Sequence, residues 1–597
     1  MEWAKDDSLD TLQCEILNDG SSPVFCLPYI EIIMTPTKKG KTTHIKIERK
    51  RRQAQDDESV VHVAGGQHQG LVIAKDSGDA DLDLGKPQLQ LGFMCFLVDQ
   101  KTNDHFVESR KLKFWYVDGT DYYNQVTTAY EFFKELVRPE NFPRDYVGFI
   151  KKCMKQMQGQ RYSLAKKIDL EIQHLDKGEA PLSPGFGKED TRPIEEIVRE
   201  KLLTVLESAY PNVLAVEDLV RITASDETIV LQQLQELRGR ELIREMEKGG
   251  FVRQVLDEKT GGTEVQMVKQ MPTIAANQQP TIAIITALYH EKMAVDSMMD
   301  NKTTYVRYKT EGESNVYTTG FIGEHKVVST KLPQIGHFRA AQISSGSITT
   351  RLLGTFQNIE HVFIVGVAGG VPRFADYYRH PRLGDIIFSK RDAKGYLYYY
   401  CDKITQDKEG EINYNLKTWA PRDVELQRIV ERIQESRGAN PEYAPWERYM
   451  QEGQELLKGQ EASYMRPPPE TDRLYMDIGD KQVIEVQHPE PPDGIKRRTD
   501  VPAVHFGVMG AGRPVRQEVS RHDFCSRYNI VACDSEFDQV LESIVGNRKD
   551  SFMFVRGVSD YIDGMHSKEW QPYAALAAAA ATKAIIKSLH NPQLDDD

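Results

Sequence analysis

The stretch Phe552–Gly564, FMFVRGVSDYIDG, lies near the C-terminus and joins an apolar run to abrupt charge. Its first four residues are apolar, as expected of a buried strand, and Arg556, Ser559 and Asp560 follow. A core strand that ends in a carboxylate presents it at the edge of the sheet, where α/β proteins bind their ligands. The stretch therefore predicts a core strand whose last residue, Asp560, has a functional role.

Four earlier apolar runs alternate with helical patterns in the same way. They are Ile282–Ile285, HVFIVGVAGGVP from His361, LGDIIFSKRD from Leu383 and NIVACDSEFDQVL from Asn529. Strands that alternate with helices predict an α/β sheet with its function at the carboxyl ends of the strands. Three of these runs lead into acids or glycines, namely Glu291, the turn Gly366–Gly370, and Asp534 with Glu536.

Each of these features alone has a structural explanation. An acid such as Glu291 or Asp534 favours the start of a helix, and a glycine turn permits close packing. All of them together, each at a strand end, favour a pocket.

The composition sets limits on the class of protein. The chain has 597 residues, enough for two to four domains, with 40% hydrophobic and 28% charged residues. Its net charge of −13 argues against a general nucleic-acid or membrane-surface binder. Seven cysteines without ligand spacing indicate reduced thiols, no metal site and a cytoplasmic protein. The acidic N-terminus is no signal peptide, and the alanine-rich run near residue 577 is too short to span a bilayer.

The first region, residues 1–178, predicts an α+β domain. Strand-like runs precede two helical stretches, and a charged segment near 38–85 is expected to be a disordered loop. The cluster ERKRR in that segment is a candidate nuclear localisation signal. A solvent-exposed charged loop is the favoured interpretation.

The second region, residues 192–256, resembles a winged helix-turn-helix domain. Three amphipathic helices precede two short strands around a Gly-Gly turn, with Ser225 expected as the N-cap of the third helix, Asp226–Arg238. That helix opens with acids, which repel DNA phosphates, although Gln232 and Gln233 would be able to contact bases. We therefore favour a protein-interaction or spacer role, and nucleic-acid binding is the less favoured alternative.

The third region, residues 279–590, resembles the nucleoside phosphorylase superfamily, and in particular its hydrolytic branch, the methylthioadenosine/S-adenosylhomocysteine nucleosidases. The shared motifs are ITALYHE with Glu291, GVAGG, the pair Gly384–Asp385, DSE at Asp534–Glu536, and Ser559–Asp560. The segments RPPPETDRLY, VHFG and WQPYAALAAAAA extend the likeness to the phosphorylase-like domains of fungal immune-receptor proteins. The resemblance implies a mixed sheet flanked by helices.

The resemblance also implies a reaction, the cleavage of a purine N-glycosidic bond, without a cofactor. Asp560, held by Ser559, would protonate the leaving base, and an apolar pocket would raise its pKa for that purpose. Glu536 would bind the ribose hydroxyls, and Glu291 would position the attacking water. The backbone of Val367–Gly369, which includes Ala368, would lie against the ribose.

The sequence departs from the family pattern around its DSE motif. Ser535 replaces the family's methionine, Phe537 replaces an alanine, and both are expected to contact the substrate. An Arg513–Pro514 pair stands in the adenine-binding loop. These departures leave open the identity of the purine and a second reading, in which the region is a nucleoside-binding sensor with weak or no catalysis.

Hydrolysis and phosphorolysis are both open from the sequence. Glu291 in the water-positioning place favours hydrolysis of a nucleoside or nucleotide. Arg339, Arg373 and Arg382 are candidate phosphate-binding residues, although surface charge is the simpler explanation for them.

An insertion near residues 401–500 separates two of the predicted strands. It contains a helix expected to end at Gly438, and it forms either a lid, an oligomer contact or a solvated surface segment. Members of the family assemble as dimers or larger rings, so the resemblance implies a homo-oligomer.

Overall fold

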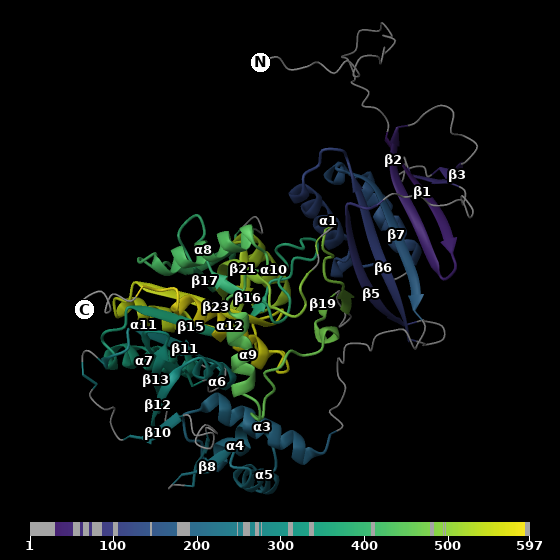
Figure 1. Ribbon diagram of the computed structural model, residues 1–597. Coiled ribbons are helices and arrows are strands. Elements are labelled where there is room, and N and C mark those ends of the chain that lie inside the picture. The colour runs from purple at the N-terminus through teal and green to yellow at the C-terminus, as the bar shows by residue number, and fades with distance from the viewer. Residues whose placement is uncertain are drawn as a thin grey trace, which may run out of the picture. The chain divides into compact units, whose positions relative to one another are not determined.

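Figure 1 shows the computed structural model of the chain. The structure describes residues 30–51, 60–63, 71–74, 86–98, 105–143, 146–175, 192–246, 249–254, 263–268, 274–275, 278–308, 314–333, 339–407, 412–477, 483–492, 495 and 497–590. The chain divides into two compact units, the first made of 1–180 with 477–484 and the second of 181–476 with 485–597. Each unit is described by itself.

Unit 1 contains two helices and a sheet of nine described strands, of which residues 474–476 of β19 and 485–486 of β20 are assigned to unit 2. The strand order is β19-β20-β5-β6-β7-β2-β1-β4-β3. The strands are β1 (Ile30–Lys39), β2 (Thr42–Arg51), β3 (Val60–Val63), β4 (Leu71–Ala74), β5 (Leu89–Val98), β6 (His105–Tyr116), β7 (Ala165–Leu175), β19 (Leu474–Asp477) and β20 (Val483–Val486), and the helices are α1 (Tyr122–Leu136) and α2 (Tyr146–Gln158). Phe93 of β5 packs against Phe133 of α1 and Phe149 of α2, which joins the helices to the sheet. The expected α+β class is confirmed.

The expectation of a disordered loop near 38–85 is wrong for its described part. Thr42–Arg51 is a full strand that pairs with β1 along its whole length, from Lys39↔Thr42 to Ile30↔Arg51. Ile45 and Ile47 alternate with charged residues and are buried, which is the period-two pattern of a half-buried strand. The lysines and arginines concealed this pattern in the sequence. Residues 52–59, 64–70 and 75–85 lie outside the described part.

The winged helix has three helices and a two-stranded sheet. Its elements are α3 (Ile194–Ala209), α4 (Val216–Thr223), α5 (Glu227–Gly239), β8 (Ile243–Glu245) and β9 (Phe251–Arg253). The N-cap of α5 is Asp226, one residue after the expected Ser225. Its carboxylate accepts the Thr228 N–H at 2.9 Å, while the Ser225 hydroxyl donates to the Thr223 carbonyl. A carboxylate is at least as good an N-cap as a hydroxyl, so the next position caps the helix instead.

A twelve-stranded mixed sheet forms the core of the remainder of unit 2. The order is β10-β12-β13-β14-β11-β15-β23-β16-β21-β17-β18, and β22 pairs with β15 and β21. The strands are β10 (Thr263–Met267), β11 (Ile282–Thr286), β12 (Asp300–Arg307), β13 (Asn315–Ile322), β14 (His325–Lys331), β15 (His361–Gly370), β16 (Ile386–Ser389), β17 (Tyr398–Gln406), β18 (Ile412–Trp419), β21 (Val504–Ala511), β22 (Ile530–Cys533) and β23 (Ser551–Asp560). β10 joins this sheet although it precedes the expected boundary at residue 279.

Helices flank this sheet. They are α6 (Tyr289–Ser297), α7 (Arg339–Thr355), α8 (Glu425–Ala439), α9 (Glu447–Leu456), α10 (Glu518–Arg527), α11 (Asp538–Gly546) and α12 (Gln571–Ile586). The alanine-rich α12 is buried on all sides and lies along β23 and β15 (Figure 1). Gly557 makes this approach possible, because a Cβ there would lie 1.9 Å from the Ala574 carbonyl oxygen. Among the residues that the structure describes, no helix is long and apolar enough to cross a membrane.

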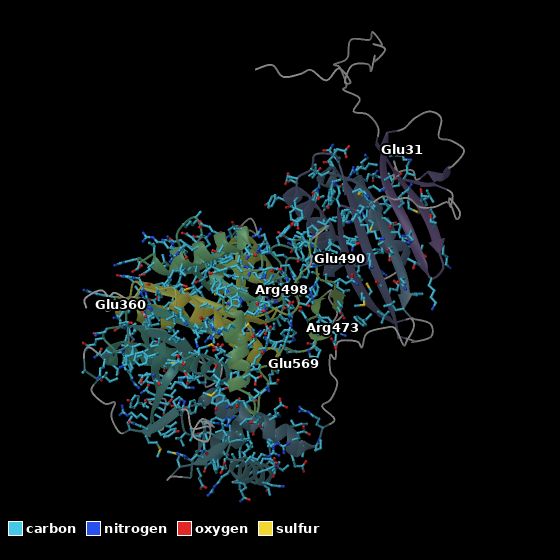
Figure 2. The ribbon with its side chains drawn as sticks, viewed as in Figure 1. Glu31, Glu360, Arg473, Glu490, Arg498 and Glu569 are labelled. Atoms are coloured by element: carbon cyan, nitrogen blue, oxygen red, sulfur yellow. The ribbon has the colours of Figure 1, made fainter. Side chains whose placement is uncertain are left out.

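Charged side chains cover the outside of unit 2. Glu360, Arg498 and Glu569 are exposed, as Figure 2 shows. A few charged groups are buried in the interior instead. They form pairs at the ends of the central strands. These buried groups define the candidate site.

Candidate functional site

The site forms where the carboxyl end of β15 meets its neighbours. Gly369 of β15 pairs with Cys533 at the end of β22 and with Asp560 at the end of β23. Glu291, in the first turn of α6, reaches the backbone of the same strand at Val367. Glu291 and Asp560 are therefore placed around one glycine-rich strand end, and Asp534 directly follows the strand residue paired with Gly369.

Glu291 is buried and fully engaged by backbone N–H groups. Its Oε2 accepts from Ala287 at 2.7 Å and Leu288 at 2.8 Å, and its Oε1 accepts from Val367 at 2.7 Å. A Cβ at Gly366 would lie 2.0 Å from this Oε1, so only glycine leaves room for the carboxylate. The helix start thus fixes Glu291 against β15.

Asp534 and Arg556 form a buried ion pair next to Glu291. Asp534 Oδ2 accepts from Arg556 Nε at 2.8 Å and lies 2.7 Å from Nη2. Burial raises the pKa of Asp534 to about 7, the negative charge of Glu291 acts in the same direction, and Arg556 opposes both. The guanidinium also lies 4.6 Å from the ring centre of Phe537. Burial therefore raises the pKa of Asp534, an acid for which the sequence predicted no catalytic role.

Glu536 lies between two arginines. Its Oε1 is 3.3 Å from Arg513 Nε and 3.2 Å from Arg516 Nη2, and its side chain is 8% exposed. A small, partly open cavity of about 20 Å³ lies beside it, lined by Ala511, Gly512, Val515, Arg516, Arg521, Cys533, Asp534, Glu536, Ile562 and Asp563. Two of the acids predicted from the sequence, Asp534 and Glu536, line it. Arg516 closely follows the Arg513–Pro514 pair of the expected adenine-binding loop, whereas no sequence pattern pointed to Arg521.

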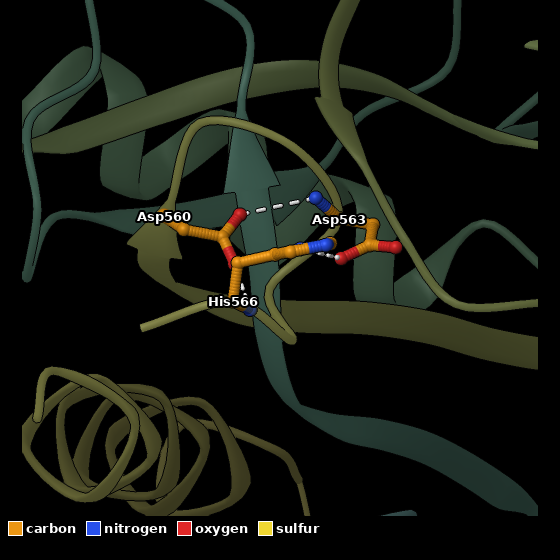
Figure 3. A group of neighbouring side chains, drawn as sticks. All are labelled: Asp560, Asp563 and His566. Carbon is orange, nitrogen blue, oxygen red and sulfur yellow. Dashed lines mark hydrogen bonds and ion pairs between the residues drawn. The ribbon is translucent and has the colours of Figure 1, made fainter. Parts of the chain in front are cut away.

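Asp560 is capped by the turn that follows it. Its Oδ1 accepts the N–H groups of Ile562, Asp563 and Gly564, and its Oδ2 accepts that of His566 (Figure 3), at 2.6–3.0 Å. The turn lies against β15, because a Cβ at Gly369 would be 2.3 Å from the carbonyl carbon of Ile562. It occupies the face of β15 that we expected to contact a ribose.

Ser559 does not hold Asp560, contrary to the expectation. Its hydroxyl donates to the Gly564 carbonyl at 2.8 Å, since the turn brings that oxygen over the strand end. Asp560, Asp563 and His566 also place one metal-ligating atom each within 4.8 Å of one another (Figure 3). Hydrogen bonds account for this grouping, including one between His566 Nδ1 and Asp563 Oδ1 at 3.0 Å.

The remaining predicted contacts lie elsewhere. Ser535 and Phe537 do not line the cavity, since the Ser535 carbonyl accepts from Tyr398 and Phe537 lies under Arg556. Arg373 donates from its guanidinium to the Ile530 carbonyl at 3.1 Å, and the backbone of Arg382 donates to Asp385. Neither arginine lines the cavity. Arg339 begins α7, and its side chain lies outside the described part.

The insertion braces the turn after Asp560. The Tyr561 hydroxyl donates to Asp472 Oδ1 at 2.5 Å, and the Trp570 indole N–H donates to Thr471 at 2.9 Å. Both acceptors belong to the segment RPPPETDRLY, and His488 donates to the Asp472 carbonyl as well. The proline-rich segment therefore holds the chain on both sides of the capping turn.

The winged helix is fastened to the end of β14. Lys331, at the end of β14, is buried and donates to the carbonyls of Ser208, Tyr210 and Leu332 at 2.9–3.1 Å. Burial lowers the pKa of Lys331 to about 7, although Glu291 and Glu207 oppose the shift. These bonds place an ammonium group at the C-terminal end of α3, where backbone carbonyls lack helical partners.

A second contact joins the wing to the start of α6. The buried guanidinium of Arg253 donates to Glu207 at 3.1 Å and lies 4.8 Å from the ring centre of Tyr289. Tyr289 is the first residue of α6, and its ring also meets that of Tyr210 edge-on. The winged helix is thus in contact with the element that supplies Glu291.

Residues 188–255 match the sequence profile of the winged helix-turn-helix domain family, which confirms that resemblance. A curated nucleotide-binding leucine-rich repeat (NLR)-like protein of Hyaloscypha variabilis is 25% identical over 314 residues, 52% of this chain and 29% of that protein. The chain therefore spans 29% of the length of the curated relative it matches.

Two solved structures are similar to the third region. One is the 5′-methylthioadenosine/S-adenosylhomocysteine nucleosidase of Neisseria meningitidis in complex with methylthio-immucillin-A, 16% identical with a TM-score of 0.32, covering 52% of this chain and all of that one. The other is the futalosine hydrolase of Helicobacter pylori, 13% identical with a TM-score of 0.32, covering 53% and all of that chain. The sequence comparison thus finds an NLR-like protein, and the structure comparison finds nucleosidase and futalosine hydrolase structures.

Proposed function

We propose that the C-terminal region hydrolyses the N-glycosidic bond of a purine nucleoside or nucleotide, with adenine as the expected base. The observation that carries this proposal is the gathering of Glu291, Asp534 and Asp560 around the glycine-rich end of β15, with Glu536 on the adjoining cavity. Breaking such a bond leaves a cationic sugar and an anionic base. The sugar is stabilised by a negatively charged group, and the base needs a proton donor.

Asp560 is the proposed proton donor to the base. Without a ligand its two oxygens accept four backbone N–H groups, so binding of a purine has to displace part of the turn Ile562–His566. Proton transfer of this kind typically contributes about 10²–10⁴-fold to the rate. The turn is therefore part of the proposed mechanism, because it must yield an oxygen of Asp560 to the substrate.

The two glutamates are proposed to act on the sugar side. Glu291 is held rigidly by three N–H groups, which suits a residue that orients a water molecule. Glu536 would accept from the ribose hydroxyls and stabilise the developing positive charge, in exchange for its contacts with Arg513 and Arg516. Those arginines would then face any anionic group of the substrate.

The test uses the whole chain with adenosine, methylthioadenosine, AMP and ATP, with and without inorganic phosphate, and separates free adenine from sugar products by chromatography. We expect adenine release that does not need phosphate and that falls about 10²–10⁴-fold in Asp560→Asn. Asp376→Asn is the matched control, because Asp376 also caps a turn through backbone N–H groups but does not stand at the end of β23. No adenine from any substrate would contradict the proposal, and release only with phosphate would identify a phosphorylase.

A ligand-binding sensor is the second candidate. Two observations favour it: Glu536 is held by two arginines, and the capping turn lies on the face of Gly369 where a ribose is expected. The similarity to an NLR-like protein points the same way. Calorimetric binding of adenosine together with intact adenosine in the recovered sample would select the sensor over the enzyme.

Self-association and a protein partner for the winged helix stay predictions. Light scattering of the purified chain checks the first. Cytoplasmic or nuclear location is likewise an expectation, which imaging of a tagged chain checks.

A further inference from the structure

Two cysteines lie side by side at the wall of the candidate site. Cys525 of α10 and Cys533 at the end of β22 are both buried, and their sulfur atoms are 3.3 Å apart. The two residues are eight positions apart, on opposite sides of the turn that joins α10 to β22. The proposed function uses neither thiol.

Both thiols border open space. A cavity of about 10 Å³ is lined by Gly370, Val371, Pro372, Arg521, His522, Cys525, Cys533, Tyr561 and Ile562. Cys533 also lines the larger cavity beside Glu536. A space of this size is close to that of a single water molecule.

We propose that Cys525 and Cys533 are a reversible oxidation site, at which a peroxide converts the two thiols into a disulfide. The sulfur of one cysteine attacks a peroxide oxygen, the O–O bond breaks, and a sulfenic acid and one water form. The second thiol then attacks that sulfur, its proton leaves with the hydroxyl group as a second water, and the S–S bond closes. Both sulfurs are oxidised and the peroxide is reduced, so atoms and electrons balance.

The geometry favours closure once the first step has occurred. A disulfide bond is about 2.05 Å long, so the sulfurs need to approach by roughly 1.2 Å from their present separation. The contact with Cys533 and burial raise the pKa of Cys525, which keeps it a thiol and makes the first step slow. A sustained exposure to peroxide is therefore needed.

Closure would act on the candidate site through the backbone. Cys533 pairs with Gly369 and directly precedes Asp534, which holds Arg556. A movement of Cys533 towards α10 would draw this strand end away from β15. We therefore expect the oxidised chain to differ from the reduced chain in ligand binding at the cavity.

The proposal is tested without any assay of activity. The full-length chain is treated with peroxide and then digested, and its peptides are analysed by mass spectrometry. Trypsin cuts after Arg521, Arg527 and Arg548, so the two cysteines fall in separate peptides, His522–Arg527 and Tyr528–Arg548. After peroxide treatment and blocking of free thiols, we expect these peptides to be joined, with a mass lower by two hydrogen atoms. Dithiothreitol should separate them again. Cys95 and Cys153, buried in unit 1, are internal controls that should stay blockable.

Several outcomes would overturn the proposal. It is overturned if the two peptides stay separate after peroxide treatment, or if one thiol is converted only to a higher acid that dithiothreitol does not reverse. In Cys525→Ser the remaining Cys533 should be trapped by dimedone as a sulfenic acid, and absence of that adduct in a folded variant would also count against it. Because the mass readout needs no substrate, its failure is distinct from a failure of the proposed hydrolysis.

Discussion

Glu291 Oε1 accepts the N–H of Val367 at 2.7 Å, which ties the first turn of α6 to the middle of the glycine-rich end of β15. This bond runs past Gly366, where any side chain would collide with the carboxylate. The glycine of the GVAGG motif thus has a specific task, which is to leave space for an acid from another element.

Gly366→Ala should destabilise the protein. The new Cβ would lie 2.0 Å from Glu291 Oε1 and 2.7 Å from Arg556 Nη1, and overpacking of this kind costs about 1–3 kcal/mol. Urea unfolding measures the change. Gly354→Ala is the control, because Gly354 is exposed in α7 with nothing within 4 Å of its Cβ position, and we expect a gain of about 0.4–1 kcal/mol. Equal loss in both variants would contradict the assigned role.

Lys331 should give the wild-type protein a distinctive pH dependence. Its pKa is about 7 when folded and 10.5 in an ordinary setting, so between these values the unfolded chain binds the extra proton. Stability rises with pH wherever the unfolded state binds more protons, so Lys331 contributes increasing stability from about pH 7 upward. Below pH 7 both states are protonated, and the contribution is constant.

The matched variants isolate this effect. Lys331→Met removes the titrating group, and Lys331→Arg keeps a positive charge throughout the range. We therefore expect the free energy of unfolding of wild type, relative to either variant, to increase between pH 7 and pH 9. Parallel pH profiles for all three proteins would show that Lys331 does not titrate in this window.

Tyr561→Phe should loosen the turn that caps Asp560. The variant loses the bond from the hydroxyl to the Asp472 carboxylate, and bonds to charged groups contribute about 1.5–3 kcal/mol. Hydrogen exchange should become faster at the amides of Ile562–His566 that donate to Asp560. Tyr443→Phe, on a ring that is 38% exposed, should leave these amides unchanged. Unaltered protection in Tyr561→Phe would show that the turn holds without its brace.

The winged helix should not bind duplex DNA tightly. The start of α5 exposes Asp226 and Glu227, and its Arg240 is paired with Glu236 at 2.5 Å. Few arginines then remain for phosphates, whose neutralisation dominates affinity for DNA. We expect no mobility shift with duplex DNA at low salt. Tight binding that weakens steeply with added salt would show that the surface is a DNA-binding one.

Much of the central sheet could be predicted from local pattern. The apolar runs of β11, β15 and β23 indicate buried parallel strands. A strand that is covered on both faces does not alternate between apolar and polar residues. Strand β2 was missed for the opposite reason, because its charged residues, which alternate with buried isoleucines, resemble a disordered tract.

The sequence by itself determined the class of each region, the acids at the strand ends and the family motifs, because periodicity and motif spacing are properties of neighbouring residues. The tertiary structure alone decided their partners. Glu536 meets Arg513 and Arg516, Asp560 meets its own turn, and Lys331 meets the end of α3. Side chains far apart in the chain meet only after the elements pack, and that packing sets which acid is buried and which is paired.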